Sequence, residues 1–84
     1  MGEVMYKVSI TCEQCSDEMS ASGADLNRLY LALQDAHFLE GGGKDCPSLQ
    51  GAMVVKDKDT DRQVGSIRVL KSRDSYERAR GVTT

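Results

Sequence analysis

The chain has 84 residues, a formal net charge of −2 and 39% hydrophobic residues, and it lacks tryptophan. A chain this short buries only about 60–65% of the surface that its unfolded form exposes, so we expect one domain, residues 1–84, with a small core. No apolar run approaches membrane-spanning length, and no apolar leader segment opens the chain. The odd number of cysteines, three, argues against a secreted disulfide framework, and we expect a reducing, cytoplasmic location.

The first predicted element is a strand over residues 3–11. Its apolar side chains occupy every second position, the period that places them on one face of a strand. These residues are Val4, Tyr6, Val8 and Ile10. The next segment, residues 16–23, is polar and made of small residues, and we interpret it as either a loop or a short second strand.

The clearest predicted element is an amphipathic helix over residues 24–40. Apolar and aromatic residues recur there at the three- and four-residue spacing of one helix face. This face consists of Leu26, Leu29, Tyr30, Leu33 and His37. Ser22 or Asp25 is the expected N-cap, and the three glycines at 41–43 are expected to end the helix.

The second half of the sequence predicts a β-hairpin and a short helix. Residues 52–56 and 64–71 have strand patterns, and the charged segment 57–62 between them has the composition of a turn. Residues 41–51, which are rich in glycine, are interpreted as a flexible connection before the hairpin. From residue 72 we expect a short helix with few apolar anchors, so residues 72–84 are a candidate for a frayed tail.

These elements predict an α+β fold. One amphipathic helix packs on a three- or four-stranded antiparallel sheet in the order β(β)αββ, followed by a short C-terminal helix. The expected core is listed as Tyr6, Val8, Ile10, Leu26, Leu29, Tyr30, Leu33, Phe38, Val55, Ile67 and Val69.

Two cysteines, Cys12 and Cys15, lie where the first strand ends, and the turn between them directs both sulfurs to the same side. The third cysteine, Cys46, and the only histidine, His37, can complete a set of four ligands. Structural zinc takes four thiolate or imidazole ligands in a tetrahedron. The sequence therefore predicts a zinc site made of Cys12, Cys15, His37 and Cys46.

The two cysteine motifs resemble those of small zinc-ribbon and treble-clef proteins. In those families a strand delivers a CxxC knuckle, here Cys12-Glu13-Gln14-Cys15, and a second knuckle, often Cys-Pro-x-Cys, follows later. The second motif here is Cys46-Pro47-Ser48-Leu49, with Leu49 in place of the fourth cysteine. The resemblance implies metal binding, with the fourth ligand position either supplied by His37 or lost.

Two other interpretations of the cysteines stay open. The three thiols can be small, partly buried apolar groups, with His37 interacting favourably with the negative end of the helix dipole. A thiol- or metal-handling function through the CxxC is the other. Thioredoxin-like enzymes place CxxC at the start of a helix, and copper chaperones run directly from it into one, whereas residues 16–23 here are polar and end in glycine.

Basic residues gather toward the C-terminus, whereas the first half of the chain is acidic. Clustered lysine and arginine side chains neutralise phosphates, and an aromatic ring can stack on a base. The candidate nucleic-acid-binding residues are Arg68, Lys71, Arg73, Tyr76, Arg78 and Arg80. The alternative interpretation is a solvated strand and tail, since acidic residues are interleaved with the basic ones.

The sequence contains no convincing catalytic set, because the single histidine lacks an orienting group and an oxyanion site. We therefore expect a small non-enzymatic module that binds another protein, with zinc as its cofactor. An inhibitor or adaptor of the kind found in phages and mobile elements fits these traits. A nucleic-acid-binding accessory protein is the second hypothesis, and a thiol- or metal-handling protein is the third.

Overall fold

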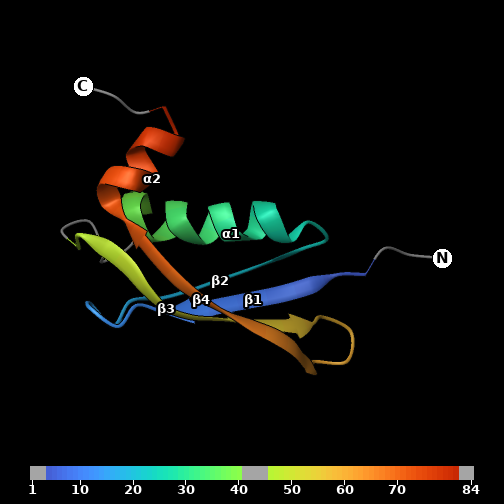
Figure 1. The fold of residues 1–84 in the computed structure, drawn as a ribbon. Helices are drawn as coiled ribbons and strands as arrows, with labels where there is room; N and C mark the ends of the chain where they lie inside the picture. The colour runs from blue at the N-terminus through green and yellow to red at the C-terminus, as the bar shows by residue number, and fades with distance from the viewer. Residues whose placement is uncertain (1–3, 41–45, 82–84) are drawn as a thin grey trace.

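The structure, a computed structural model, describes residues 4–40 and 46–81, which form four strands, two α-helices and one π-helical segment. In chain order they are β1 (Tyr6–Thr11), β2 (Glu18–Gly23), α1 (Leu26–Asp35), the π-helical segment η1 (Ala36–Glu40), β3 (Ser48–Asp57), β4 (Gln63–Ser72) and α2 (Arg73–Ala79). The strands pair antiparallel in the order β2-β1-β3-β4 (Figure 1). The predicted α+β fold is confirmed.

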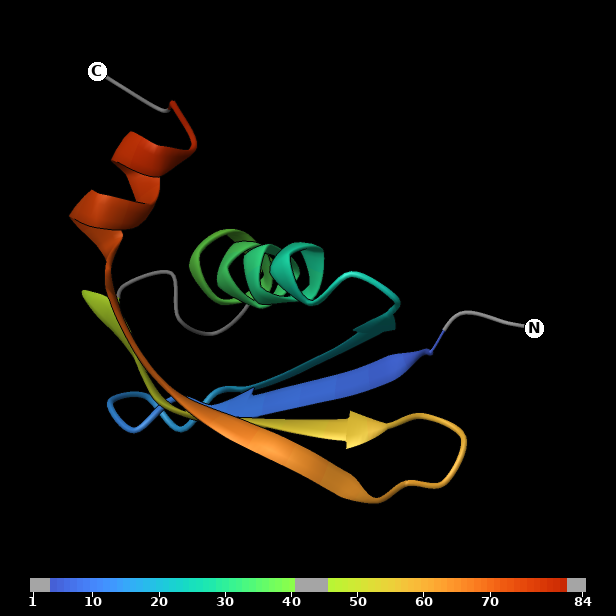
Figure 2. The same cartoon turned by 45° about the vertical axis from the view of Figure 1, so that its right-hand side comes forward.

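One face of the sheet carries α1, and none of the described helices covers the other face (Figure 2). The helix packs mainly over β1 and β2, so it leaves the corresponding face of β4 less covered. The core lies between this helix and the sheet. Its buried apolar members are Val8, Ile10, Cys12, Met19, Leu29, Leu33, Phe38, Cys46, Leu49, Met53, Val55, Val69 and Tyr76. No helix within the described ranges is long and apolar enough to cross a bilayer.

The core prediction was wrong at Ile67, and three other predicted core residues are only partly buried. Ile67 is 52% exposed, because β4 lies to the side of the helix rather than beneath it. Tyr6, Leu26 and Tyr30 are only partly buried, and they pack against the edge of the core. The strands that a helix covers are determined by tertiary packing, and the hydrophobic periodicity of a single element does not predict them.

The segment between residues 16 and 23, which the sequence left as loop or strand, contains the edge strand β2. It pairs with β1 along its whole length, with Val8 opposite Ala21 and Ile10 opposite Met19. Met19 is buried under α1, and Ala21 is partly buried. Small residues on β2 allow the helix to approach the sheet closely.

The predicted flexible connection over residues 41–51 is wrong for its last part. Residues 41–45 lie outside the described residues, but β3 already begins at Ser48, which pairs with Ser72 of β4. Gly51, which suggested a loop, is a strand residue at a close approach to β1. A Cβ atom at this position would lie 2.5 Å from the carbonyl oxygen of Thr11. Glycine is needed here because the backbones of β3 and β1 lie too close together to leave room for a side chain.

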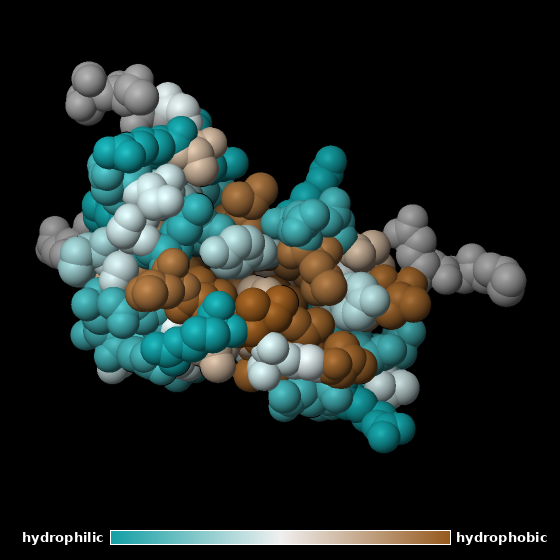
Figure 3. Space-filling model, in the orientation of Figure 1, coloured by the Kyte–Doolittle hydropathy of each residue, from teal (hydrophilic) through white to brown (hydrophobic). Residues whose placement is uncertain are grey.

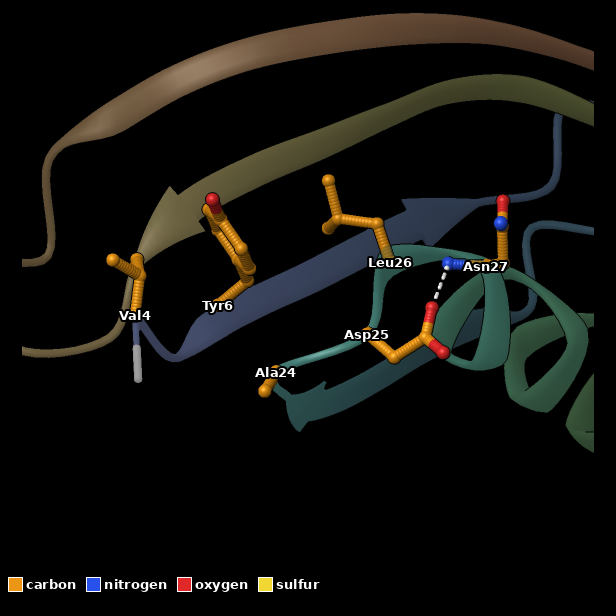
Figure 4. Close-up of a pocket in the computed structure, with 6 residues that line it drawn as sticks. All are labelled: Val4, Tyr6, Ala24, Asp25, Leu26 and Asn27. Atoms are coloured by element: carbon orange, nitrogen blue, oxygen red, sulfur yellow. Dashed lines mark hydrogen bonds between the residues drawn. The ribbon is translucent and has the colours of Figure 1, made fainter. Parts of the chain in front are cut away.

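Asp25 caps α1, as one of the two predicted caps. Its side-chain oxygen accepts hydrogen bonds from the backbone N–H groups of Asn27, at 3.0 Å, and Arg28, at 3.4 Å; Figure 4 shows the first of these. The predicted helix continues beyond α1 as the π-helical segment η1 through residue 40. The glycines expected to end it lie outside the described residues.

The helix α2 is anchored to the end of α1 through Tyr76. Ser72 caps α2 by accepting a hydrogen bond from the Ser75 N–H. Tyr76 is 2% exposed, and its ring lies 4.7 Å from that of Phe38. Its hydroxyl donates to Asp35 at 2.6 Å. One aromatic residue therefore provides both packing and a polar tie for this short helix.

Candidate metal centre and apolar groove

Three separate segments bring Cys12, Cys15, His37 and Cys46 together at one end of the sheet. The turn between β1 and β2 carries Cys12 and Cys15, η1 carries His37, and Cys46 lies just before β3. In Figures 1 and 2 this turn, the end of the α1–η1 helix and the start of β3 lie at the same end of the molecule. One potential ligand atom from each residue lies within 4.8 Å of all the others. The structure thus brings the four predicted residues together.

The sulfur spacing fits a shared tetrahedral metal ion. The Sγ atoms of Cys12 and Cys46 are 3.8 Å apart. Two thiolates at the usual Zn–S distance of about 2.3 Å from one tetrahedral ion are about 3.8 Å apart. A disulfide would need a separation of about 2.05 Å, and all three cysteines are free thiols. Cys12, His37 and Cys46 are buried, whereas Cys15 is the most exposed of the four.

Backbone hydrogen bonds hold the CxxC turn in a compact form. The Cys12 N–H donates to the carbonyl of Asp17 at 2.8 Å, and the Ser16 N–H donates to the carbonyl of Cys12 at 2.8 Å. Ser16 adopts a left-handed conformation, with a φ of 63°, which turns the chain sharply into β2. The Glu13 N–H donates to the carbonyl of Gln50 in β3 at 2.7 Å, so the turn is also fixed to the central sheet.

His37 lies fully buried on the π-helical segment, between the sulfurs and an acidic residue. Its Nε2 atom lies 3.2 Å from the carbonyl oxygen of Ser48. Its Nδ1 atom faces Oδ2 of Asp17 at 3.8 Å. The ring of Phe38 packs against it edge-on, with the ring centroids 4.7 Å apart. π-Helical turns are frequent at functional sites.

A polar layer centred on Ser48 lines the cluster. The Ser48 carbonyl accepts hydrogen bonds from the thiols of Cys46, at 2.9 Å, and Cys12, at 3.6 Å. The Ser48 hydroxyl donates to Oε1 of Gln14 at 2.7 Å and accepts from Nε2 of Gln50 at 2.8 Å. These contacts join the CxxC turn to the start of β3, and sequence patterns gave no signal for them.

Arg73, predicted as part of a nucleic-acid-binding surface, forms hydrogen bonds to the segment that carries Cys46. Its Nε and Nη2 atoms donate to the carbonyl of Cys46 at 3.2 and 3.1 Å. Its guanidinium carbon lies 5.0 Å from the centroid of the Phe38 ring, a cation–π contact. The first residue of α2 therefore positions the third cysteine.

The two cysteines of the turn differ in acidity. Burial acts to raise the pKa of Cys12, but hydrogen bonds from the backbone of Gln50 and of the turn outweigh it, and the pKa falls below the usual value. Partial loss of hydration at its sulfur, together with the thiols of Cys12 and Cys46, raises the pKa of Cys15 to about 11, although the residue as a whole is exposed. In the metal-free protein Cys15 therefore keeps its proton, which a metal ion would displace on binding.

The other candidate nucleic-acid-binding residues are mostly engaged within the chain. Arg68 makes two hydrogen bonds of 2.8 Å to the carboxylate of Glu13. Arg78 pairs with Asp74 at 3.0 Å and Arg80 with Asp35 at 3.1 Å. Lys71 is half-exposed on β4, and the ring of Tyr76 is not at the surface.

A second feature lies at the opposite end of α1, where apolar side chains line a groove between α1 and β4. Leu26 lines three adjoining hollows, of about 660, 440 and 460 Å³, and the last two also contain Ile67. Figure 4 shows Val4, Tyr6 and Leu26 in the first of them. In Figure 3 the apolar residues form a brown band across this face. We call this surface the apolar groove and define it as Val4, Tyr6, Leu26, Tyr30, Val64 and Ile67.

Comparisons with family models, curated proteins and solved structures found no match for this chain. The similarity to zinc ribbons therefore rests on the cysteine motifs alone. Fold and site define the protein as a small α+β domain in which three cysteines and one histidine form a cluster compatible with a metal site.

Proposed function

We propose that this protein is a non-enzymatic interaction module whose fold is closed by one zinc ion bound to Cys12, Cys15, His37 and Cys46. The observation that carries the proposal is the convergence of these four side chains from three segments. An ion bound there would link the β1–β2 turn, the end of the helix and the start of β3. A small domain with a limited core gains most from such a link.

The donor set favours zinc and a structural role. Thiolates and imidazole are soft to borderline ligands, whereas magnesium and calcium require oxygen ligands. Four protein ligands fill a tetrahedral ion completely, whereas catalytic zinc sites keep one position for water or substrate. The chain therefore uses the ion for stability rather than for chemistry.

The apolar groove supports the interaction part of the proposal. Val4, Val64 and Ile67 are each more than half exposed, and they lie together rather than scattered. Contiguous exposed apolar surfaces on small proteins mark interaction sites. β4, which borders the groove, pairs with only one strand within the described ranges, so its outer edge can also accept a partner's backbone.

The metal is tested by elemental analysis of protein purified under reducing conditions without added metal. We expect one zinc per chain, and substitution by Co²⁺ should give the absorption of a tetrahedral thiolate complex. Cys12→Ser should lose the metal, whereas Ser20→Ala, an exposed residue on β2, should retain it. Wild-type protein that takes up no zinc at micromolar free metal would refute the metal-binding part.

The interaction surface is tested with a pair of matched charge substitutions. Ile67→Asp introduces a charge into the apolar groove, whereas Ser20→Asp introduces the same charge on the exposed edge strand β2. A specific partner from the native host should bind the wild type and Ser20→Asp but not Ile67→Asp. A partner that binds all three proteins equally would show that the apolar groove is not the binding surface.

A further inference from the structure

One ring nitrogen of the buried His37 side chain lacks a hydrogen-bond partner. Among the described residues, its Nδ1 atom and Oδ2 of Asp17 are the buried side-chain polar atoms without a hydrogen-bond partner. The two atoms face each other at 3.8 Å, which is too long for a hydrogen bond. Buried polar groups are nearly always hydrogen-bonded, so this pair requires an explanation.

Neither neutral tautomer of His37 resolves the arrangement. If the proton is on Nε2, it is donated to the Ser48 carbonyl at 3.2 Å, and the lone pair of Nδ1 faces the Asp17 carboxylate. If the proton is on Nδ1, the lone pair of Nε2 faces the Ser48 carbonyl oxygen instead. In each case one nitrogen and one oxygen meet without a proton between them.

A metal ion on Nε2 removes this conflict. The carbonyl of Ser48, which Nε2 faces, also contacts the sulfurs of Cys12 and Cys46, so Nε2 is the nitrogen on the sulfur side of the ring. With its lone pair on the ion, the neutral ring carries its proton on Nδ1, opposite Asp17. The three thiols release their protons to solvent, whereas His37 loses no proton overall.

We propose that Asp17 is a positioning residue for the metal centre, which accepts a hydrogen bond from Nδ1 of His37 and thereby selects the tautomer that binds zinc through Nε2. This inference rests on the proposed zinc site and adds the residue that orients its histidine. Metal-bound histidines usually donate their second ring nitrogen in this way, and loss of the acceptor typically weakens metal affinity about 10–100-fold.

The location of Asp17 suits this role. It directly follows the CxxC turn, and its own carbonyl accepts the Cys12 N–H at 2.8 Å, so one residue contacts two ligand segments. Its side chain is 23% exposed, with Oδ2 buried against the histidine. A shortening of less than 1 Å would bring the two atoms to hydrogen-bond distance.

The experiment measures zinc affinity by competition with a chelator for the wild type, Asp17→Ala and Asp17→Asn. We expect about 10–100-fold weaker binding for Asp17→Ala, and a smaller loss for Asp17→Asn, whose amide oxygen can still accept the bond. Glu18→Gln is the matched control, because it removes the same charge from the neighbouring exposed residue and should change affinity less than about twofold.

A second measurement does not depend on the variants' folding. Nitrogen-15 NMR of the zinc-loaded wild type should show a protonated Nδ1 and a metal-bound Nε2 on His37. Coordination through Nδ1, or an Asp17→Ala affinity within twofold of the wild type, would overturn the role of Asp17. Wild-type protein that binds no zinc would instead refute the underlying metal site, so the two failures can be told apart.

Discussion

The two ends of α1 differ in how they meet the sheet. At the C-terminal end the space between helix and sheet is closed by buried thiols, His37 and the ring of Phe38. At the N-terminal end the helix leaves β4 uncovered, and Leu26 and Ile67 line open hollows. The closed end has buried thiols and an imidazole, whereas the open end combines exposed apolar side chains with charged residues such as Asp57 and Arg68. One small domain thus separates the cluster proposed to bind zinc from the surface proposed to bind a partner.

Removal of the proposed zinc ion should have the largest effect, and it should act on the closed end. At zinc concentrations about 1,000-fold above the dissociation constant, binding stabilises the folded state by about 4 kcal/mol. For a domain of this size that corresponds to a fall in Tm of about 15–30 °C when a chelator is added. Calorimetry with and without chelator measures it, with zinc added back as the control. A Tm that does not change with chelator would contradict a structural ion.

Two glycine substitutions compare the ends directly. Gly51→Ala places a Cβ 2.5 Å from the Thr11 carbonyl, beside the CxxC turn, and should cost about 1–3 kcal/mol of unfolding free energy and weaken metal binding. Gly65→Ala, on β4 beside the groove, meets no atom within 4 Å and should be neutral or stabilise by less than about 1 kcal/mol. Urea unfolding of both variants checks this difference. Equal losses of unfolding free energy in the two variants would mean that the closed end is not tightly packed.

Tyr76→Phe tests the polar tie between α2 and α1. Loss of the hydroxyl that donates to Asp35 should cost about 1 kcal/mol at pH 7. Burial and the Asp35 carboxylate raise the pKa of Tyr76 above that of an unfolded tyrosine. The hydroxyl's contribution is therefore complete below about pH 10 and is lost as the pH rises through the folded-state pKa.

The difference in stability between wild type and Tyr76→Phe should accordingly shrink at alkaline pH. Urea titrations at pH 7 and above pH 10 measure it. Tyr30→Phe, at the open end, controls for general alkaline loss of stability. A difference that grows with pH would show that the ionised form of Tyr76 is favoured in the fold, contrary to its surroundings.

The smallest effect on stability is expected at the apolar groove. Ile67→Ala should change the unfolding free energy by less than about 1 kcal/mol, because half of the side chain is already in water. Val69→Ala, on the same strand but buried, should cost more. Denaturant unfolding of the pair shows whether the open end contributes to the core. A larger loss at Ile67 than at Val69 would place the groove inside the folded core.

The sequence predicted which four side chains lie close together because a CxxC at a strand end is a local pattern, and only four thiol or imidazole groups were available to combine. It did not predict the contacts that support them. Asp17, Ser48 and Arg73 act through tertiary contacts, and no spacing rule marks such residues. The element order followed from periodicity, whereas the early start of β3 was missed because Gly51 has the composition of a loop and the geometry of a crowded strand.

The exposed position of Cys15 would affect how fast a zinc ion in the proposed site exchanges, rather than how tightly the ion binds. Three of the four ligand residues are buried, so an incoming chelator or thiolate would reach a bound ion past Cys15. Ligand exchange proceeds one bond at a time, and the accessible sulfur is the one that can be replaced without unfolding. Exchange of a zinc ion in the proposed site with a chelator should therefore begin at Cys15.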